Sequence, residues 1–170
     1  RGSEMMAISA QQTKIHVAIA AWQWPSYFSK EAKMRGLKLQ QSKWARPAPN
    51  TAPTASKAAG LYMICTMSKH AAEAEGFDDA LMLDYRGLIA EATGANLFFI
   101  IDGKIHTPTP DCFLDGITRR TAMELARKNG IEVVERHIKP EEIKNASEAF
   151  FTGTAAEVTP IGRIGEQSFN

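Results

Sequence analysis

The order of apolar and polar positions along the chain predicts a mixture of strands and helices. Residues 14–24 form a nearly continuous apolar run, which is typical of a strand that is buried on both faces. A short helix is expected over residues 30–35, and a second strand over residues 37–45. Three prolines between residues 46 and 54 predict an irregular connector there, because proline lacks the backbone N–H.

Two longer stretches repeat their apolar positions at helical spacing. Residues 58–75 and 116–129 are followed by Gly76 and Gly130, and a glycine in this place commonly closes a helix. The positions expected to face the interior are Leu61, Ile64, Cys65, Ser68, Ala71 and Ala72 in the first helix and Thr118, Ala122, Leu125 and Ala126 in the second.

The segments between and after these helices are predicted to be strands. Residues 80–84 and 88–91 flank a four-residue turn, and residues 96–101 and 104–107 flank an Asp-Gly pair, which is a strong hairpin signal. Two consecutive hairpins indicate antiparallel pairing.

Three further elements complete the prediction. Strands are expected over residues 131–138 and 148–152, and a short helix is expected after Pro140. Helices and strands are mixed without strict alternation, so the sequence predicts an α+β fold rather than a doubly wound sheet.

The composition fits one globular domain. The chain has 170 residues, of which 44% are hydrophobic and 23% are charged. Its longest uncharged run, residues 15–29, contains polar residues and is shorter than the roughly 20 apolar residues that span a membrane. No membrane partner is therefore expected. The two cysteines form no C-x-x-C pair and no signal peptide is visible, so we expect a cytoplasmic protein with packing roles for both thiols.

The charge is unevenly distributed, although the net charge is only +1. Residues 1–57 carry nine Lys/Arg against two Asp/Glu, whereas residues 58–170 carry eleven against seventeen. The basic residues are scattered singly, so a solvated face or a rim around a small anionic ligand is favoured over nucleic acid. The four histidines show no metal-ligand spacing, and no metal site is expected.

Two charged residues stand among small or apolar neighbours. Lys57 lies in the small-residue string 54–60, where an amine shielded from water would have a lowered pKa and could attack a carbonyl group. A surface lysine is the alternative. Glu91 follows an apolar strand, and a partly buried carboxylate there needs a cationic or N–H partner. A purely structural ion pair is the alternative.

Two short segments are suited to hold an anion. Residues 115–118, Asp-Gly-Ile-Thr, open the second long helix, whose free N–H groups and dipole attract phosphate. Residues 153–156, Gly-Thr-Ala-Ala, offer a hydroxyl and exposed N–H groups in a turn. Either segment alone could simply cap the backbone. Together with the amine of Lys57 and the carboxylate of Glu91, they supply the parts of a pyridoxal phosphate site.

Four segments make the chain similar to a known family. They resemble the branched-chain aminotransferases of the class IV, fold-type IV pyridoxal phosphate enzymes, and the similarity covers nearly the whole chain after Lys14. The segments are residues 46–62, 78–110, 113–136 and 149–165. The resemblance implies the large domain of that fold, which is a mixed, largely antiparallel sheet or barrel packed with helices. Residues 1–13 would be a remnant of the small N-terminal domain and linker, and residues 14–170 a large domain truncated at its C-terminus.

The resemblance also implies a role for each site residue. Lys57 would form a Schiff base with pyridoxal 5′-phosphate and carry a proton between the substrate Cα and the cofactor aldehyde carbon. Tyr62 would hydrogen-bond the phenolate oxygen of the ring, Glu91 would bind the ring nitrogen, and Leu114 would pack on the ring face. The phosphate would be bound at Gly116, Ile117, Thr118 and Thr154, and the substrate carboxylate at Thr154 and Ala155.

The implied reaction moves an amino group between Leu, Ile or Val and 2-oxoglutarate, in a dimer or larger homo-oligomer. D-amino-acid aminotransferases and aminodeoxychorismate lyases share the lysine, the glutamate and the Gly-Ile-Thr-Arg string, so they are alternatives. A fragment that only binds phosphate-bearing ligands is another.

The chain departs from the family pattern in two ways. Most of the small N-terminal domain is missing, and in the family that domain contributes to the site, so we expect the chain alone to be poorly active. Asp115 stands where the family usually has proline, and Gly60-Leu61 where it has Gly-Asn. Both substitutions are expected to be tolerated, with some loss of phosphate affinity from the like charge of Asp115.

Overall fold

The structure is a computed structural model that describes residues 4–5 and 8–169. None of the helices in this part of the chain is long and apolar enough to cross a bilayer. The elements in chain order are α1 (Lys30–Arg35), β1 (Leu37–Gln41), the 3-10 helix η1 (Ala59–Leu61), α2 (Tyr62–Ala74), β2 (Asp79–Leu83), β3 (Ile89–Ala92), β4 (Asn96–Ile101), β5 (Lys104–Pro108), α3 (Ile117–Lys128), β6 (Val133–Arg136), the 3-10 helix η2 (Pro140–Asn145), β7 (Ala146–Gly153), β8 (Glu157–Ile164) and β9 (Gln167–Ser168).

Six of the strands form a closed ring. They pair in the order β3-β2-β1-β8-β7-β4, and a further pairing of β3 with β4 joins the two ends of this series. β5 and β6 continue the sheet from β4, and β9 pairs with β8. The pairs β1–β2, β1–β8 and β5–β6 are parallel and the others are antiparallel. The prediction of an α+β fold with a mixed, largely antiparallel sheet or barrel is confirmed.

The inside of the ring is the main apolar core. Leu37 and Leu39 of β1 are 0% exposed, as are Leu81, Leu97 and Phe151 from other strands of the ring. Leu37 and Leu39 are two residues apart, the spacing that places both on one face of a strand. Burial of each such side chain contributes roughly 1.5–3 kcal/mol. This core fixes the strand ends from which the site is built.

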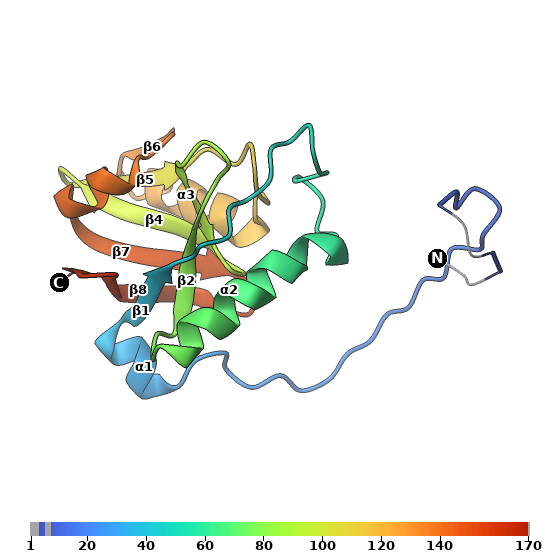
Figure 1. The fold of residues 1–170 in the computed structure, drawn as a ribbon. Helices are drawn as coiled ribbons and strands as arrows, with labels where there is room; N and C mark the ends of the chain where they lie inside the picture. Colours follow the sequence, from blue (N-terminus) through green and yellow to red (C-terminus); the bar gives the residue numbers. More distant parts are fainter. Residues whose placement is uncertain (1–3, 6–7, 170) are drawn as a thin grey trace.

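Helix α2 packs against β2 on the outside of the ring (Figure 1). It buries Cys65, Ser68 and Ala72, which belong to the helical face predicted from the sequence. The predicted helix begins earlier, at residue 58, but the structure has the irregular Ala58 followed by η1 before α2 starts.

Helix α3 packs against β7 and β6, but its buried face differs from the predicted one. Arg119 and Met123 are its buried residues, whereas Leu125 is 54% exposed. Arg119 can be buried because its guanidinium is 2.9 Å from Asp115 and 2.6 Å from Glu135. A buried charge needs such partners, and a pattern of apolar residues alone does not reveal them.

The hairpin of β4 and β5 follows the local turn signal. Asp102 and Gly103 have φ values of 51° and 74°, as the tight hairpin turn with two left-handed residues requires. Asp-Gly accepts this conformation readily, so the predicted turn is confirmed.

The prediction of a buried strand over residues 14–24 is wrong. This stretch has neither strand nor helix, and Ile15, Val17 and Ile19 are 86%, 86% and 97% exposed. Figure 1 shows the chain before α1 running away from the sheet. An apolar run indicates that burial of the segment is favourable, but it does not indicate which surface covers it.

Strands β8 and β9 were not predicted. β8 lies between β7 and β1, although it contains Pro160 and Gly162, which usually interrupt a strand. Pro160 precedes Ile161, where pairing with β1 begins, and it lies opposite Phe150 of β7. A Cβ on Gly162 would lie 2.7 Å from the Arg35 carbonyl oxygen. This glycine therefore permits the close approach of α1 to the sheet.

Candidate active site

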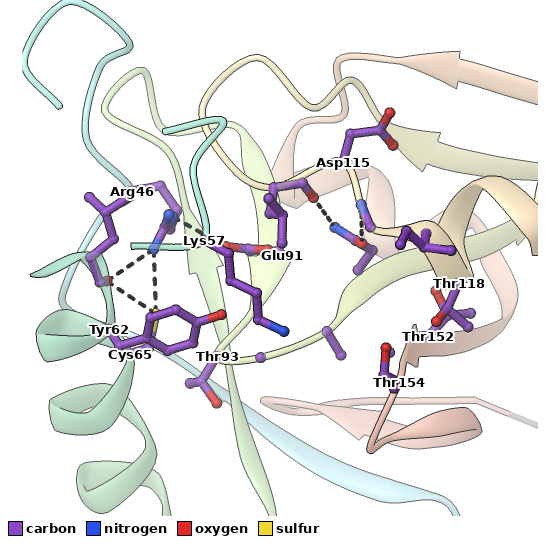
Figure 2. A pocket seen from close by; sticks show the side chains of 18 of the residues that line it. Arg46, Lys57, Tyr62, Cys65, Glu91, Thr93, Asp115, Thr118, Thr152 and Thr154 are labelled. Atoms are coloured by element: carbon purple, nitrogen blue, oxygen red, sulfur yellow. Dashed lines mark hydrogen bonds and ion pairs between the residues drawn. The ribbon is translucent and has the colours of Figure 1, made fainter. Parts of the chain in front are cut away.

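A cavity of about 310 Å³ lies where the ends of β3 and β7 meet the first turns of α2 and α3 (Figure 2). Its walls come from segments that are far apart in the sequence. The residues predicted to bind the cofactor that line it are Lys57, Tyr62, Glu91, Leu114, Gly116, Ile117, Thr118 and Thr154. The structure thus brings all of them to one cavity.

Lys57 enters the cavity from the loop between β1 and η1. Figure 2 shows its amine in the middle of the cavity, between Tyr62 and Thr154. The residue is exposed, and so are residues 55 and 56 before it. This side of the loop faces solvent in the described chain, so the exposure agrees with the surface-lysine alternative and not with an amine shielded from water.

Glu91 is the buried acid of the cavity, with 8% exposure. Arg46 Nε lies 3.2 Å from Glu91 Oε1, so the ion pair that the sequence left open is present. Among the described residues, no donor forms a hydrogen bond with the Glu91 carboxyl group. Burial raises the pKa of Glu91 to about 8, and the charge of Arg46 opposes this rise. The carboxyl group is thus able to bind a further donor in the cavity.

Tyr62 is the first residue of α2 and is 38% exposed. Its side chain lies beside the cavity in Figure 2. Partial burial raises the pKa of the phenol, and the nearby charge of Glu91 raises it further. A phenol with a raised pKa stays protonated at neutral pH, so it can donate a hydrogen bond to a ligand oxygen.

The first turn of α3 forms another wall of the cavity. Its N-cap residue, Gly116, provides no side-chain cap, so the first N–H groups of the helix are open to an anion. Asn96 fixes this turn: Nδ2 donates to the Leu114 carbonyl at 2.9 Å, and Oδ1 accepts from the Gly116 N–H at 3.2 Å. A Cβ on Gly116 would lie 2.4 Å from Asn96 Oδ1. Glycine is therefore needed for this contact.

The charge of Asp115 is compensated outside the cavity. Arg119 Nη1 and Arg120 Nη1 lie 2.9 Å and 3.2 Å from its carboxylate oxygens. In Figure 2 the carboxylate points away from the cavity. This geometry argues against the expected repulsion between Asp115 and a phosphate group.

Three threonines gather at the α3 end of the cavity (Figure 2). Thr118 belongs to α3, Thr152 to the end of β7, and Thr154 to the turn that follows. Thr152 is 1% exposed, and its hydroxyl has no hydrogen-bond partner within the described part of the chain. An unpaired buried polar group costs about 1–3 kcal/mol. A ligand oxygen at this place would remove that cost.

A second cavity, of about 860 Å³, adjoins the first. The two cavities share six residues, among them Lys57, Tyr62 and Thr154, whereas Ala155 lines the second cavity only. The aromatic residues that line it are Trp22, Trp24, Tyr27, Phe28 and Phe151. Polar groups at the junction and aromatic walls beyond it suit a small molecule with a charged head and an apolar side chain.

The family model described as amino-transferase class IV matches residues 1–164. The chain belongs to the class IV aminotransferases. Over 163 residues it is 44% identical to a branched-chain-amino-acid aminotransferase of Pseudomonas aeruginosa, covering 96% of this chain and 53% of that protein.

Solved structures agree with this membership. The Escherichia coli branched-chain amino acid aminotransferase superposes with a TM-score of 0.85 at 40% identity, covering 89% of this chain and 50% of that one. An aminotransferase from Brucella abortus, solved with the cofactor pyridoxal phosphate bound, gives a TM-score of 0.78 at 33% identity. The match covers 86% of this chain and 51% of that one. The chain therefore spans about half the length of these relatives.

In this class IV aminotransferase chain, several cavity residues were not assigned a role from the sequence. They are Arg46, Cys65, Thr93, Asn96 and Thr152. The available signal was weak: Asn96 and Thr152 are polar residues within apolar strands, and such residues need hydrogen-bond partners when buried. Arg46 precedes the proline-rich connector, and no spacing links it to Glu91.

A separate cluster gathers possible metal-ligand atoms of Asp84, Asp111 and Cys112 within 4.8 Å of one another. Arg86 occupies this cluster, because its Nη2 lies 2.6 Å from Asp84 Oδ2 and 2.8 Å from Asp111 Oδ1. The guanidinium neutralises both carboxylates. The cluster thus joins the β2–β3 turn to the loop that leads to α3.

Proposed function

We propose that this chain is the cofactor-binding domain of a pyridoxal 5′-phosphate-dependent branched-chain aminotransferase. The meeting of Lys57, Tyr62, Glu91 and the first turn of α3 around one cavity carries the proposal. The names of relatives at 44% and 40% identity support the substrate class. Because the chain spans about half the length of those relatives, the activity is proposed for the whole protein of which it forms part.

The residues of the cavity fit pyridoxal 5′-phosphate. The carboxyl group of Glu91 accepts no hydrogen bond from the described residues, so it would hold the ring nitrogen. Tyr62 would donate a hydrogen bond to the phenolate oxygen. Leu114 lies in the same wall and would contact the ring. The open N–H groups of α3 and the nearby hydroxyls would bind the phosphate dianion, at Gly116, Ile117, Thr118 and Thr154.

The bound cofactor supplies an electron sink for negative charge at the substrate Cα. Lys57 would hold the cofactor through its amine, yield this place to the substrate amine, and then move a proton between the substrate Cα and the cofactor aldehyde carbon. Glu91 would share a proton with the ring nitrogen. Its pKa of about 8 favours a proton at this position near neutral pH.

The substrate would occupy the junction of the two cavities. The N–H groups at Thr154 and Ala155 would bind its carboxylate, and the aromatic wall with Trp24 and Tyr27 would receive its branched alkyl chain. Each buried CH₂ group contributes about 0.8 kcal/mol, which favours Leu, Ile and Val over smaller amino acids. The amino group would pass to 2-oxoglutarate.

The proposal extends to the organisation of the whole protein. Residues 1–13 would be a remnant of a small N-terminal domain and its linker, and residues 14–170 the large domain. The exposed Ile15, Val17 and Ile19 and the exposed Lys57 support further cover from the rest of the protein. We therefore expect poor turnover from the chain alone and a cytoplasmic homo-oligomer for the whole protein.

Labelling of the lysine tests the site. The chain is reduced with borohydride in the presence of pyridoxal 5′-phosphate, and peptides are mapped by mass spectrometry. A pyridoxyl group is expected on Lys57, and Lys57→Ala should take none while keeping its circular dichroism spectrum. A label on another lysine, such as Lys69, in place of Lys57 would contradict the assignment.

Turnover separates the alternatives. The intact gene product is assayed with a panel of L- and D-amino acids and 2-oxoglutarate, and transfer from L-Leu, L-Ile and L-Val is expected. Transfer from D-amino acids, or lyase activity, would place the protein in another branch of the family. A phosphate-ligand binder would show no turnover and would keep its affinity for pyridoxal 5′-phosphate in Lys57→Ala.

A further inference from the structure

We infer that Arg46 is a positioning residue, which favours the charged form of the Glu91 carboxyl group and fixes this group relative to the first turn of α2. The effect of Arg46 on a bound cofactor ring rests on the proposed function. The contacts of Arg46 with Glu91 and α2 are present in the chain without any ligand. Figure 2 shows the Arg46 guanidinium between Glu91 and the start of α2, with Cys65 also in reach.

Arg46 joins three parts of the fold. It is 4% exposed, and its backbone N–H donates to the Leu83 carbonyl at 2.8 Å, which anchors it beside the end of β2. Its Nε lies 3.2 Å from Glu91 Oε1 on β3. Its Nη1 lies 3.4 Å from both the Leu61 carbonyl oxygen and Cys65 Sγ, at the start of α2. One buried guanidinium therefore relates the acid to the turn that carries Tyr62.

The contact between Arg46 and Glu91 is mainly electrostatic. Arg46 Nε has no hydrogen-bond partner among the described residues, so its N–H is not directed at the carboxylate only 3.2 Å away. The carboxylate oxygens thus remain able to accept a hydrogen bond from a donor in the cavity. The nearby positive charge meanwhile offsets part of the cost of burying the carboxylate.

No other described neighbour of Glu91 supplies a fixed positive charge. Lys57 lines the same cavity, but its amine is the group assigned to the cofactor. The other side chains that face Glu91 from β2, α2 and β4 carry no positive charge: two of them do not titrate, and a phenol and a thiol are neutral when protonated. They are Met82, Tyr62, Cys65 and Asn96.

Loss of the Arg46 charge should therefore raise the pKa of Glu91. An opposite charge within about 4–6 Å lowers a carboxyl pKa by about 1–3, and burial acts alone once that charge is gone. Near neutral pH the variant would carry a more completely protonated Glu91. The protonated carboxyl group would then accept a hydrogen bond from a protonated ring nitrogen less well than the wild-type carboxylate would.

Carbon-13 NMR of the cofactor-free chain tests this inference directly. The Glu91 carboxyl carbon is followed through a pH titration, and Glu91→Gln assigns its signal. Arg46→Met should raise the Glu91 pKa by about one or more, whereas Arg46→Lys should restore most of the wild-type value because the charge is kept. Arg46→Gln provides a second neutral variant in case Arg46→Met does not fold.

Arg136→Met is the matched control. It removes an arginine that pairs with Glu142 at 2.8 Å and should leave the Glu91 pKa as in the wild type. An unchanged Glu91 pKa in a folded Arg46→Met or Arg46→Gln would overturn the inference.

A second titration separates this inference from the proposed function. Pyridoxal 5′-phosphate is added, and the pH midpoint of its visible absorption is compared between wild type, Arg46→Met and Arg46→Lys. We expect the pH midpoint of the absorption to differ from wild type in Arg46→Met and to return towards the wild-type value in Arg46→Lys. A chain that binds no cofactor would contradict the proposed function but leave the NMR result intact. A bound cofactor whose midpoint is the same in all three would count against Arg46.

Discussion

At the scale of single residues, Glu91 links the site to the stability of the cofactor-free chain. Burial raises its pKa from 4.5 to about 8 in the folded chain. Between these values the folded chain holds a proton that the unfolded chain has released, so the stability due to this group is full below pH 4.5 and is lost as the pH rises through about 8. We therefore expect Glu91→Gln to gain stability relative to wild type as the pH rises.

Urea unfolding between about pH 5 and pH 9 measures this gain, at about 1.4 kcal/mol for each pKa unit of difference that the pH change traverses. Glu148→Gln is the control, because Glu148 is exposed on β7. Its difference from wild type should stay nearly constant with pH. A constant difference for Glu91→Gln as well would show that the Glu91 pKa is not raised.

Thr152, at the α3 end of the cavity, gives a second residue-scale prediction. Its buried hydroxyl has no partner in the described chain, and valine has nearly the same shape. We expect Thr152→Val to be as stable as wild type, or more stable by up to about 1–3 kcal/mol. Its affinity for pyridoxal 5′-phosphate should fall about tenfold, because one hydrogen bond to a charged group is lost.

Thermal unfolding and a fluorescence titration with pyridoxal 5′-phosphate measure the two effects of Thr152→Val. Thr121→Val is the control, since the Thr121 hydroxyl is exposed and donates to the Ile117 carbonyl of its own helix. It should keep the affinity of wild type. If Thr152→Val were less stable than wild type but bound pyridoxal 5′-phosphate equally well, the Thr152 hydroxyl would not contact the ligand.

At the scale of elements, the start of α3 depends on the contact between Asn96 and Gly116. A Cβ at position 116 would lie 2.4 Å from Asn96 Oδ1, so Gly116→Ala should cost about 1–3 kcal/mol. Asn96→Ala removes that oxygen together with its two hydrogen bonds. The double variant should therefore lose less stability than the two single variants together.

Chemical denaturation of the four proteins of this cycle measures the coupling. Gly60→Ala is the control, because nothing lies within 4 Å of a Cβ at that position, and it should not destabilise the chain. Strict additivity of Gly116→Ala and Asn96→Ala would show that the asparagine does not hold the start of α3.

The elements that were predicted correctly have signals within a few residues. Asp102 and Gly103 define their own turn through positive φ values, and the buried side of α2 follows its helical spacing. β8 was missed because Pro160 and Gly162 interrupt the strand pattern, and the reason for Gly162 lies in its close approach to the end of α1. Such reasons exist only in the folded chain.

At the scale of the whole molecule, the same distinction applies to the site. The sequence identified Lys57, Glu91 and Thr154, because residue type and motif define their chemistry, and the fold brings them to one cavity. It did not identify Arg46 as the partner of Glu91, since β2 and α2 fix that pairing. It left open whether Lys57 is shielded or exposed, because that depends on what covers the loop.

The exposed segment of residues 14–24 gives the last prediction. Because Trp22 is 65% exposed whereas Phe28 is 9% exposed and packs in the core, limited chymotrypsin digestion should cut first after Trp22 and leave the ring of strands intact. Mass spectrometry identifies the cut, and circular dichroism should show nearly the same melting temperature for the shortened chain. Trp22→Ala should slow this cleavage.

The intact gene product is the decisive comparison. The apolar side chains of residues 14–24 favour cover by the rest of the protein. If they are covered, the peptide bond after Trp22 should resist chymotrypsin in the intact gene product under the same conditions. Equal cleavage in both forms would show that this segment stays exposed in the whole protein. Early cleavage within β4 or β7 of the chain itself would instead contradict a stable ring, because backbone in a paired strand must open before a protease can bind it.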